Sequence, residues 1–137
     1  KPKETDKKNI QDLLKTLNID EFEVKIVRHD AWYGYRNKYI HRIIDFQEKA
    51  GLIGYKTSSE ILNNLINNFC SKLDDFTEYI SMRLYGRGDW LIPFKDNPDV
   101  NPIEKIKKET EVMNDLTQKC FSELETLMEF LRKKEYI

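Results

Sequence analysis

The stretch TSSEILNNLINNFCSKLDDFTEYISMRL, residues 57–84, decides the fold class of this 137-residue chain. Its apolar side chains recur every three or four residues, which is the period of an α-helix with one face in a core. Thr57 and Glu60 precede them with the spacing of a capping box, so we expect a helix to begin there. The apolar positions are Ile61, Leu62, Leu65, Ile66, Phe69, Leu73, Phe76, Ile80 and Leu84.

Three further segments have a helical period: residues 4–17, a long aromatic run over residues 21–46 that contains Gly34, and residues 101–137. Residues 86–100, GRGDWLIPFKDNPDV, contain glycines and prolines without such a period and predict a connecting loop. No segment predicts a strand. The sequence therefore predicts an all-α fold, a bundle of about four helices that forms a single helical domain over residues 1–137.

The composition narrows the class of protein. Hydrophobic residues make up 39% and charged residues 34%, and 5 Gly with 4 Pro argue against a turn-rich β-sandwich. The net charge of −1 means that any site for nucleic acid must be a local patch. No signal peptide or membrane-spanning run is recognisable, so we expect a cytoplasmic protein without membrane contact. The chain starts at Lys1 rather than Met, which fits trimming at the N-terminus.

The residues that usually hold metal ions are not suitably spaced in this sequence. The chain contains no His-x-x-x-His, Glu-x-x-His or Cys-x-x-Cys motif. Cys70 and Cys120 lie in different predicted helices and fit no zinc spacing. We therefore expect no metal or other cofactor, and we expect both cysteines to be buried and reduced.

The segment YRNKYIHRI, residues 35–43, places Arg36, Asn37 and His41 within the second predicted helix. On a straight helix with roughly 100° per residue, Asn37 and His41 share one flank, whereas Arg36 points into the apolar side. A guanidinium group there has to be paired, face a cleft or an interface, or be moved by a kink at Gly34. The alternative is a structural arginine between two helices, with His41 merely exposed.

Basic and aromatic side chains surround this motif. The basic ones are opposed by Asp30 alone and predict a patch that attracts phosphate. The tyrosines offer faces on which RNA bases can stack. The basic residues are Lys25, Arg28, Arg36, Lys38 and Arg42, and the tyrosines are Tyr33, Tyr35 and Tyr39. From these sets we predict RNA contacts at Arg28, Lys38, Arg42, Tyr33 and Tyr39.

The motif Arg36-Asn37-x-x-x-His41 resembles the signature of HEPN domains, all-α bundles found in many bacterial toxins and defence systems. Together with the loop and capped helix that follow, YRNKYIHRIIDF looks like the abortive-infection branch of that superfamily. The resemblance covers roughly residues 20–85. One difference is that only about one predicted helix precedes the motif, whereas more helix commonly precedes it in these folds.

The resemblance implies a metal-independent endoribonuclease, a toxin or phage-defence effector, that works as a homodimer with both motifs in one cleft. Attack of the RNA 2′-hydroxyl on phosphorus needs a base, an acid and a cation, which two copies of the motif together supply. By position, His41 would be the acid or base, Arg36 would bind phosphate, and Asn37 would orient one of the two. The apolar side that holds Arg36 would then be the dimer face.

A second function stays open, because many relatives keep the bundle without activity. In that case the chain would be a non-catalytic helical domain that binds a protein partner or RNA. RNA, a second copy of the chain, and an antitoxin or regulatory protein are the partners expected from the first interpretation.

Overall fold

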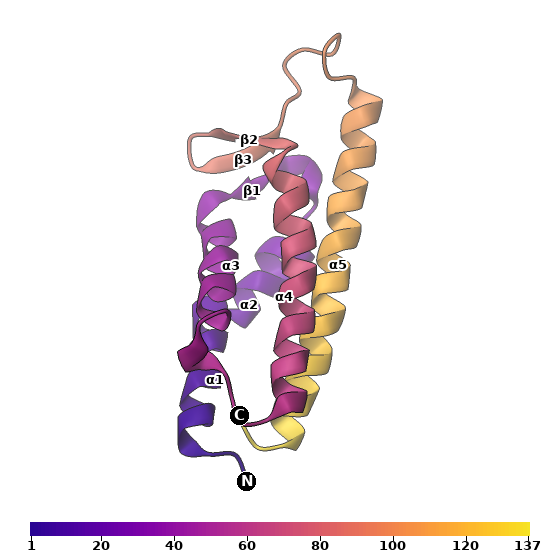
Figure 1. Cartoon of the computed structure of the whole chain (residues 1–137). Coiled ribbons are helices and arrows are strands. Elements are labelled where there is room, and N and C mark those ends of the chain that lie inside the picture. The colour runs from indigo at the N-terminus through magenta and orange to yellow at the C-terminus, as the bar shows by residue number, and fades with distance from the viewer.

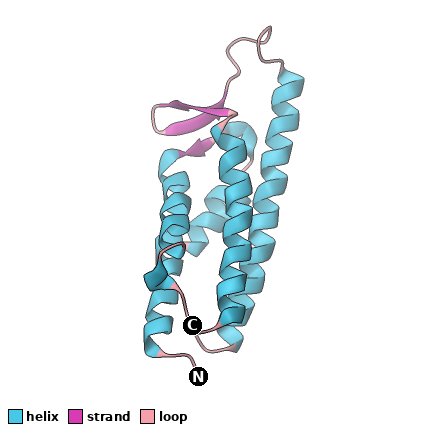
Figure 2. Ribbon diagram, viewed as in Figure 1, coloured by secondary structure: helices cyan, strands magenta, loops and turns pink.

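The computed structural model describes residues 1–137, which are mostly helical. Four helices of at least 14 residues form an elongated bundle (Figure 1). A small three-stranded sheet lies at the end of the bundle remote from both termini (Figure 2). The helical bundle is thus confirmed, whereas the expectation of no strands is wrong. The elements are α1 Glu4–Leu17, α2 Ile19–Phe22, β1 Tyr35–Arg36, α3 Asn37–Ala50, α4 Glu60–Ser81, β2 Leu84–Arg87, β3 Trp90–Pro93 and α5 Ile103–Lys133.

Helices α4 and α5 run side by side along the length of the bundle (Figure 1). Their buried residues recur at alternating steps of three and four, so each helix has one continuous stripe that packs against its neighbours. Both helices were predicted from this period and are confirmed. The stripe of α4 consists of Leu62, Ile66, Phe69, Leu73, Phe76 and Ile80, and that of α5 of Ile106, Thr110, Met113, Thr117, Cys120, Leu124, Leu127 and Leu131.

The ends of α4 differ from the prediction. Ser59, rather than Thr57, is the N-cap, and its hydroxyl accepts a hydrogen bond from the Leu62 N–H at 3.2 Å. The buried Thr57 instead holds the preceding loop, with its hydroxyl 2.9 Å from Asn63 Oδ1. At the other end the helix stops at Ser81, so Leu84 belongs to β2.

The predicted long helix over residues 21–46 is wrong. The chain leaves α2 through a π-helical turn, Glu23–Val27, and a 3₁₀ turn, Ala31–Tyr33, before β1 and α3. Asp30 caps the 3₁₀ turn, because its side chain accepts a hydrogen bond from the Trp32 N–H at 3.0 Å. Gly34 follows with φ 75° and ψ −172°, which no helix allows. The predicted weak point at Gly34 is therefore a complete break.

The predicted connecting loop is also wrong in its first part, because a β-hairpin lies there. Strands β2 and β3 pair with Arg87 opposite Trp90, which leaves Gly88 and Asp89 as a two-residue turn. Strand β1 joins the other edge of β3, with Tyr35 opposite Leu91. The sheet therefore connects the break after α2 to a segment more than fifty residues later in the chain.

Phe69 of α4 joins the helices into one core. Its ring makes edge-to-face contacts with Phe22 of α2 and Phe46 of α3, at centroid distances of 5.9 and 5.4 Å. Ile40 and Ile43 of α3 are buried in the same core. The apolar side of α3 is therefore used within its own bundle, and the prediction that this side forms a dimer face is wrong.

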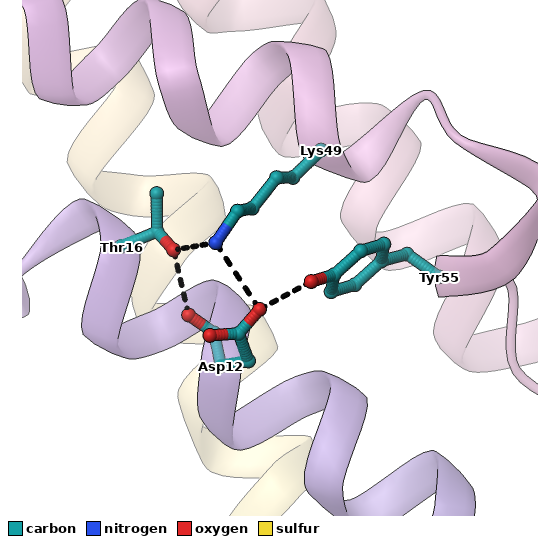
Figure 3. Close-up of polar contacts among 4 residues, drawn as sticks. All are labelled: Asp12, Thr16, Lys49 and Tyr55. Atoms are coloured by element: carbon teal, nitrogen blue, oxygen red, sulfur yellow. Dashed lines mark hydrogen bonds and ion pairs between the residues drawn. The ribbon is translucent and has the colours of Figure 1, made fainter.

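A polar network links α1 to the end of α3 and the loop that follows (Figure 3). The Asp12 carboxylate accepts hydrogen bonds from the Tyr55 hydroxyl and, at 3.2 Å, from Lys49 Nζ. Lys49 also donates to the Thr16 hydroxyl at 2.9 Å. The hydrogen bond from Tyr55, followed by that from Lys49, lowers the pKa of Asp12 below its ordinary value.

Gly34→Ala tests the close approach of β1 to β3. A Cβ at this position would lie 2.4 Å from the Leu91 carbonyl oxygen, at a backbone conformation that side chains rarely adopt. We expect the free energy of unfolding, measured with urea, to fall by at least about 2 kcal/mol. The control is Gly54→Ala, whose Cβ would meet nothing within 4 Å and should change little. Equal stability of the two variants would contradict the observed docking of the sheet.

Asp12→Asn tests the network in Figure 3. Because the pKa of Asp12 is lowered in the folded state, its stabilising effect is present above the ordinary value of 3.8 and is lost as the pH falls through the folded pKa. We expect a lower urea midpoint than wild type at neutral pH and a difference that closes in strong acid. Asp45→Asn, at an exposed position of α3, is the control and should have no such pH-dependent deficit.

Candidate functional site

Hydrogen bonds hold the segment between α2 and α3 against α5. Asn114 of α5 accepts a hydrogen bond from the Ala31 N–H at 2.9 Å and donates one to the Asp30 carboxylate at 3.1 Å. These bonds hold the 3₁₀ turn, from which Gly34 directs the chain into β1. The position of the predicted motif therefore depends on contacts with α5 and the hairpin, both remote in sequence.

Arg36 is the last residue of β1 and the N-cap of α3, so the prediction that it lies inside a helix is wrong. It is exposed rather than directed into an apolar core. Its guanidinium carbon is 5.2 Å from the centroid of the Trp90 ring, opposite it in β3. It forms no ion pair, in contrast to Arg28, which pairs with an acid. Its charge is thus positioned by an aromatic ring and free to bind an anion.

Asn37 holds the hairpin turn. Its N–H donates to the Asp89 carbonyl at 2.8 Å, and its side-chain Nδ2 donates to the Gly88 carbonyl at 3.3 Å. These bonds use the first N–H of α3 and fix the end of the helix against the turn. The side chain of Asn37 therefore has a structural role in this chain, and its Oδ1 atom and the second N–H of Nδ2 remain free to orient another group.

His41 lies in the second turn of α3, exposed and without a side-chain hydrogen bond in the protein. It is on the same flank of the helix as Asn37, as predicted. It is roughly 200° around the helix from Tyr39, which lines a pocket with Arg36. The structure therefore brings Arg36 together with Tyr39 and leaves His41 on another side of α3.

The other predicted RNA-binding residues have different surroundings. Arg28 and Arg42 form ion pairs with Glu23 and Glu21, at 2.6 and 2.8 Å, so their charges are already balanced. Lys38 lies with its Nζ 5.2 Å from the centroid of the Tyr39 ring and has no acidic partner. Tyr33 is 66% exposed, so its side chain is accessible to a ligand.

A small pocket of about 90 Å³ lies beside Arg36. None of its lining residues is acidic, and they combine basic with aromatic side chains. They are Lys25, His29, Tyr35, Arg36, Tyr39 and Trp90. Of these, His29 and Trp90 were not predicted as site residues, Lys25 was noted only for its charge, and Tyr35 only for its ring face. The missed signal is Gly88-Asp89 between two short apolar runs, which is typical of a hairpin and would have moved Trp90 out of the loop.

His29 is fixed in the pocket by its neighbours. Its Nε2 atom is 2.6 Å from the Gly34 carbonyl oxygen, which can only accept, so Nε2 must donate. Its ring centroid is 5.7 Å from that of Tyr35. The neutral imidazole therefore keeps its acceptor at Nδ1, and the ring is held to the backbone at the helix break.

Tyr35 is the most buried residue of the pocket. Its hydroxyl is inaccessible to solvent and has no hydrogen-bond partner in the protein. Its ring packs edge-to-face on Phe76 of α4, with a centroid distance of 5.5 Å. Burial, followed by the charge of Asp30, raises the pKa of this phenol far above its ordinary value, so it stays protonated.

The thiols lie outside the pocket. Burial raises the pKa of Cys70 to about 11 and that of Cys120 to about 12, so neither is a thiolate at neutral pH.

No group of three His, Cys, Asp or Glu side chains is gathered closely enough to hold a metal ion. Among the helices, none combines the length and apolar character needed to cross a membrane.

Comparisons with protein-family models, with curated proteins and with solved structures find no match to this chain.

Tyr35→Phe tests the unpartnered hydroxyl. Burial without a partner costs the folded state free energy, so removing this hydroxyl should leave the free energy of unfolding unchanged or raise it by about 1 kcal/mol. Tyr55→Phe is the matched variant, because the Tyr55 hydroxyl donates to Asp12 and its loss should lower stability. Urea unfolding measures both. A clear loss of stability in Tyr35→Phe would mean that its hydroxyl is hydrogen bonded in solution.

Proposed function

We propose that this chain is a metal-independent endoribonuclease of the HEPN type, a toxin or phage-defence effector that acts as a homodimer on cytoplasmic RNA. The observation that carries the proposal is that both key residues of the motif have free functional groups. Arg36 has no acidic partner, and the ring of His41 is exposed without a hydrogen bond. Neither group is occupied by another side chain of the protein, so a phosphate can reach Arg36 and a substrate hydroxyl can reach His41.

The chemistry follows from the two side chains. A base removes the proton of the RNA 2′-hydroxyl, whose oxygen forms a bond to the adjacent phosphorus. The bond from phosphorus to the 5′-oxygen then breaks, and an acid donates a proton to that oxygen. A single His41 can serve in both roles, because the imidazole nitrogen that takes up the proton of the 2′-hydroxyl can then donate it to the 5′-oxygen. Arg36 stabilises the charge that develops on the phosphate oxygens.

A second copy of the chain solves a problem of geometry. Arg36 faces the pocket that Tyr39 lines, whereas His41 lies on another side of the same helix. One chain therefore does not direct both groups at one phosphate, and His41 of a second copy would complete the site. Val24 and Tyr33 lie one and two residues from pocket residues in the sequence, and because they are 54% and 66% exposed they offer apolar surface for that copy to cover. An antitoxin or regulatory protein could compete for the same surface.

A non-catalytic domain that binds RNA or a protein partner is the second candidate. The observation that favours it is the pocket itself, in which Arg36 lies with Tyr39 and Trp90 but without His41. Basic and aromatic side chains in one place are sufficient to bind single-stranded nucleic acid without cutting it.

Incubation of total RNA with the purified chain in EDTA tests the endoribonuclease. Wild type should cut RNA, and His41→Ala and Arg36→Ala should each slow cleavage by at least about 100-fold. Arg132→Ala is the control, because Arg132 is exposed and lacks an acidic partner but lies in the last turn of α5. RNA that stays intact with folded wild type favours the binding domain instead.

Mixing the two inactive variants tests the shared site. If Arg36 of one copy works with His41 of another, a mixed dimer of Arg36→Ala and His41→Ala retains one complete pair. With random exchange of copies, we expect an equal mixture to recover about a quarter of the wild-type rate. If the mixture stays as inactive as its components although the copies exchange, each site must be built within one chain.

A further inference from the structure

The pocket beside Arg36 has two positive charges that no acidic side chain of the protein neutralises. Lys25 and Arg36 contribute two positive charges, and neither forms an ion pair. No acidic side chain lines the pocket to offset them. In a molecule with a net charge of −1, two unpaired cations beside one cavity attract an anion locally.

Trp90 restricts the orientation of the Arg36 guanidinium group before an anion binds. The guanidinium carbon lies 5.2 Å from the ring centroid, and the backbone of the two residues is paired between β1 and β3. Stacking on an aromatic face limits the orientations of the planar guanidinium while leaving its N–H groups free to donate. Less conformational entropy is then lost when Arg36 binds an anion.

The size of the pocket limits what can enter it. Its volume of about 90 Å³ is well below the roughly 300–1,000 Å³ of pockets that bury whole small molecules, so it suits a group as large as one phosphate rather than a nucleoside. The rest of a nucleotide would lie outside, and Tyr39 and Trp90, which line the pocket, offer aromatic surface suited to a base.

We propose that this pocket is the phosphate-binding subsite for RNA, in which Lys25 is a second phosphate ligand beside Arg36 and Trp90 is the positioning residue for Arg36. The proposal rests on the proposed function for the identity of the ligand as RNA, but it requires no cleavage. It adds Lys25 and Trp90 to the residues of the motif. Lys25 comes from the π-helical turn and Trp90 from the hairpin, so the break in the predicted helix and the sheet together create the subsite.

Binding of a single-stranded 2′-O-methyl RNA oligonucleotide tests this subsite, because such RNA lacks the attacking hydroxyl and cannot be cut. Fluorescence anisotropy should give a dissociation constant about tenfold higher for Lys25→Gln than for wild type. The dependence of log binding constant on log salt should become shallower by about 0.7, the value for one lost phosphate contact with a single strand. Lys108→Gln, an exposed lysine of α5 without an acidic partner, should match wild type.

Small ligands show which part of RNA the pocket recognises. Trp32→Phe leaves Trp90 as the only tryptophan of the chain. We expect inorganic phosphate and uridine 5′-monophosphate to change the Trp90 emission at constant ionic strength, and uridine to leave it unchanged. The Lys25→Gln change introduced into this variant should weaken the response to phosphate.

The results of these experiments show separately whether the phosphate subsite or the endoribonuclease activity is wrong. If Lys25→Gln binds the oligonucleotide as tightly as wild type and Lys108→Gln, or if phosphate leaves Trp90 emission unchanged, the subsite is wrong. This holds even where wild type cuts RNA. If binding weakens in Lys25→Gln while wild type leaves total RNA intact, the proposed phosphate subsite is supported and the proposed endoribonuclease activity is contradicted.

Discussion

The conformation of Gly34 is the constraint on which the end of the molecule with the candidate site depends. With φ 75° and a would-be Cβ 2.4 Å from the Leu91 carbonyl oxygen, this residue lets β1 approach β3 more closely than any side chain would allow. The carbonyl oxygen of Gly34 also accepts a hydrogen bond from His29 Nε2. Because β1 is paired with β3, Arg36 lies opposite Trp90 and α3 begins at Asn37. One backbone position therefore sets the sheet, the start of a helix and the direction of the arginine.

The arginines around Gly34 differ in whether an acidic side chain neutralises their charge. Arg28 and Arg42, which look equivalent to Arg36 in sequence, are paired with Glu23 and Glu21. Exposed pairs of this kind contribute little to stability, but they compete with any phosphate for the arginine. Arg36 is held by an aromatic ring instead, which orients its charge without neutralising it. Of the basic patch predicted around the motif, only Lys25, Arg36 and Lys38 thus remain without an acidic partner, and Lys25 and Arg36 line one pocket.

The sequence was sufficient for the part of the fold that depends on local periodicity. The stripes of α4 and α5 are regular over many turns, so both helices and the bundle could be predicted. The run over residues 21–46 has a similar apolar content, but its conformation is decided by Gly34 and by pairing with the distant Leu91. Periodicity does not report such pairing, and the Gly88-Asp89 turn that signals it was interpreted as part of a loop. Arg36 was consequently placed in a helix, whereas the shared flank of Asn37 and His41 needed only helical geometry and could be predicted.

In the proposed function, the free Arg36 and His41 act on an RNA phosphate, and the neighbouring 2′-hydroxyl is the nucleophile. Analysis of the ends of RNA products formed in EDTA tests this claim most directly, because the ends record which oxygen attacked phosphorus. We expect 2′,3′-cyclic phosphate and 5′-hydroxyl ends with wild type, and neither with Arg36→Ala. Products with 5′-phosphate ends, or the same ends from Arg36→Ala at an unchanged rate, would contradict it.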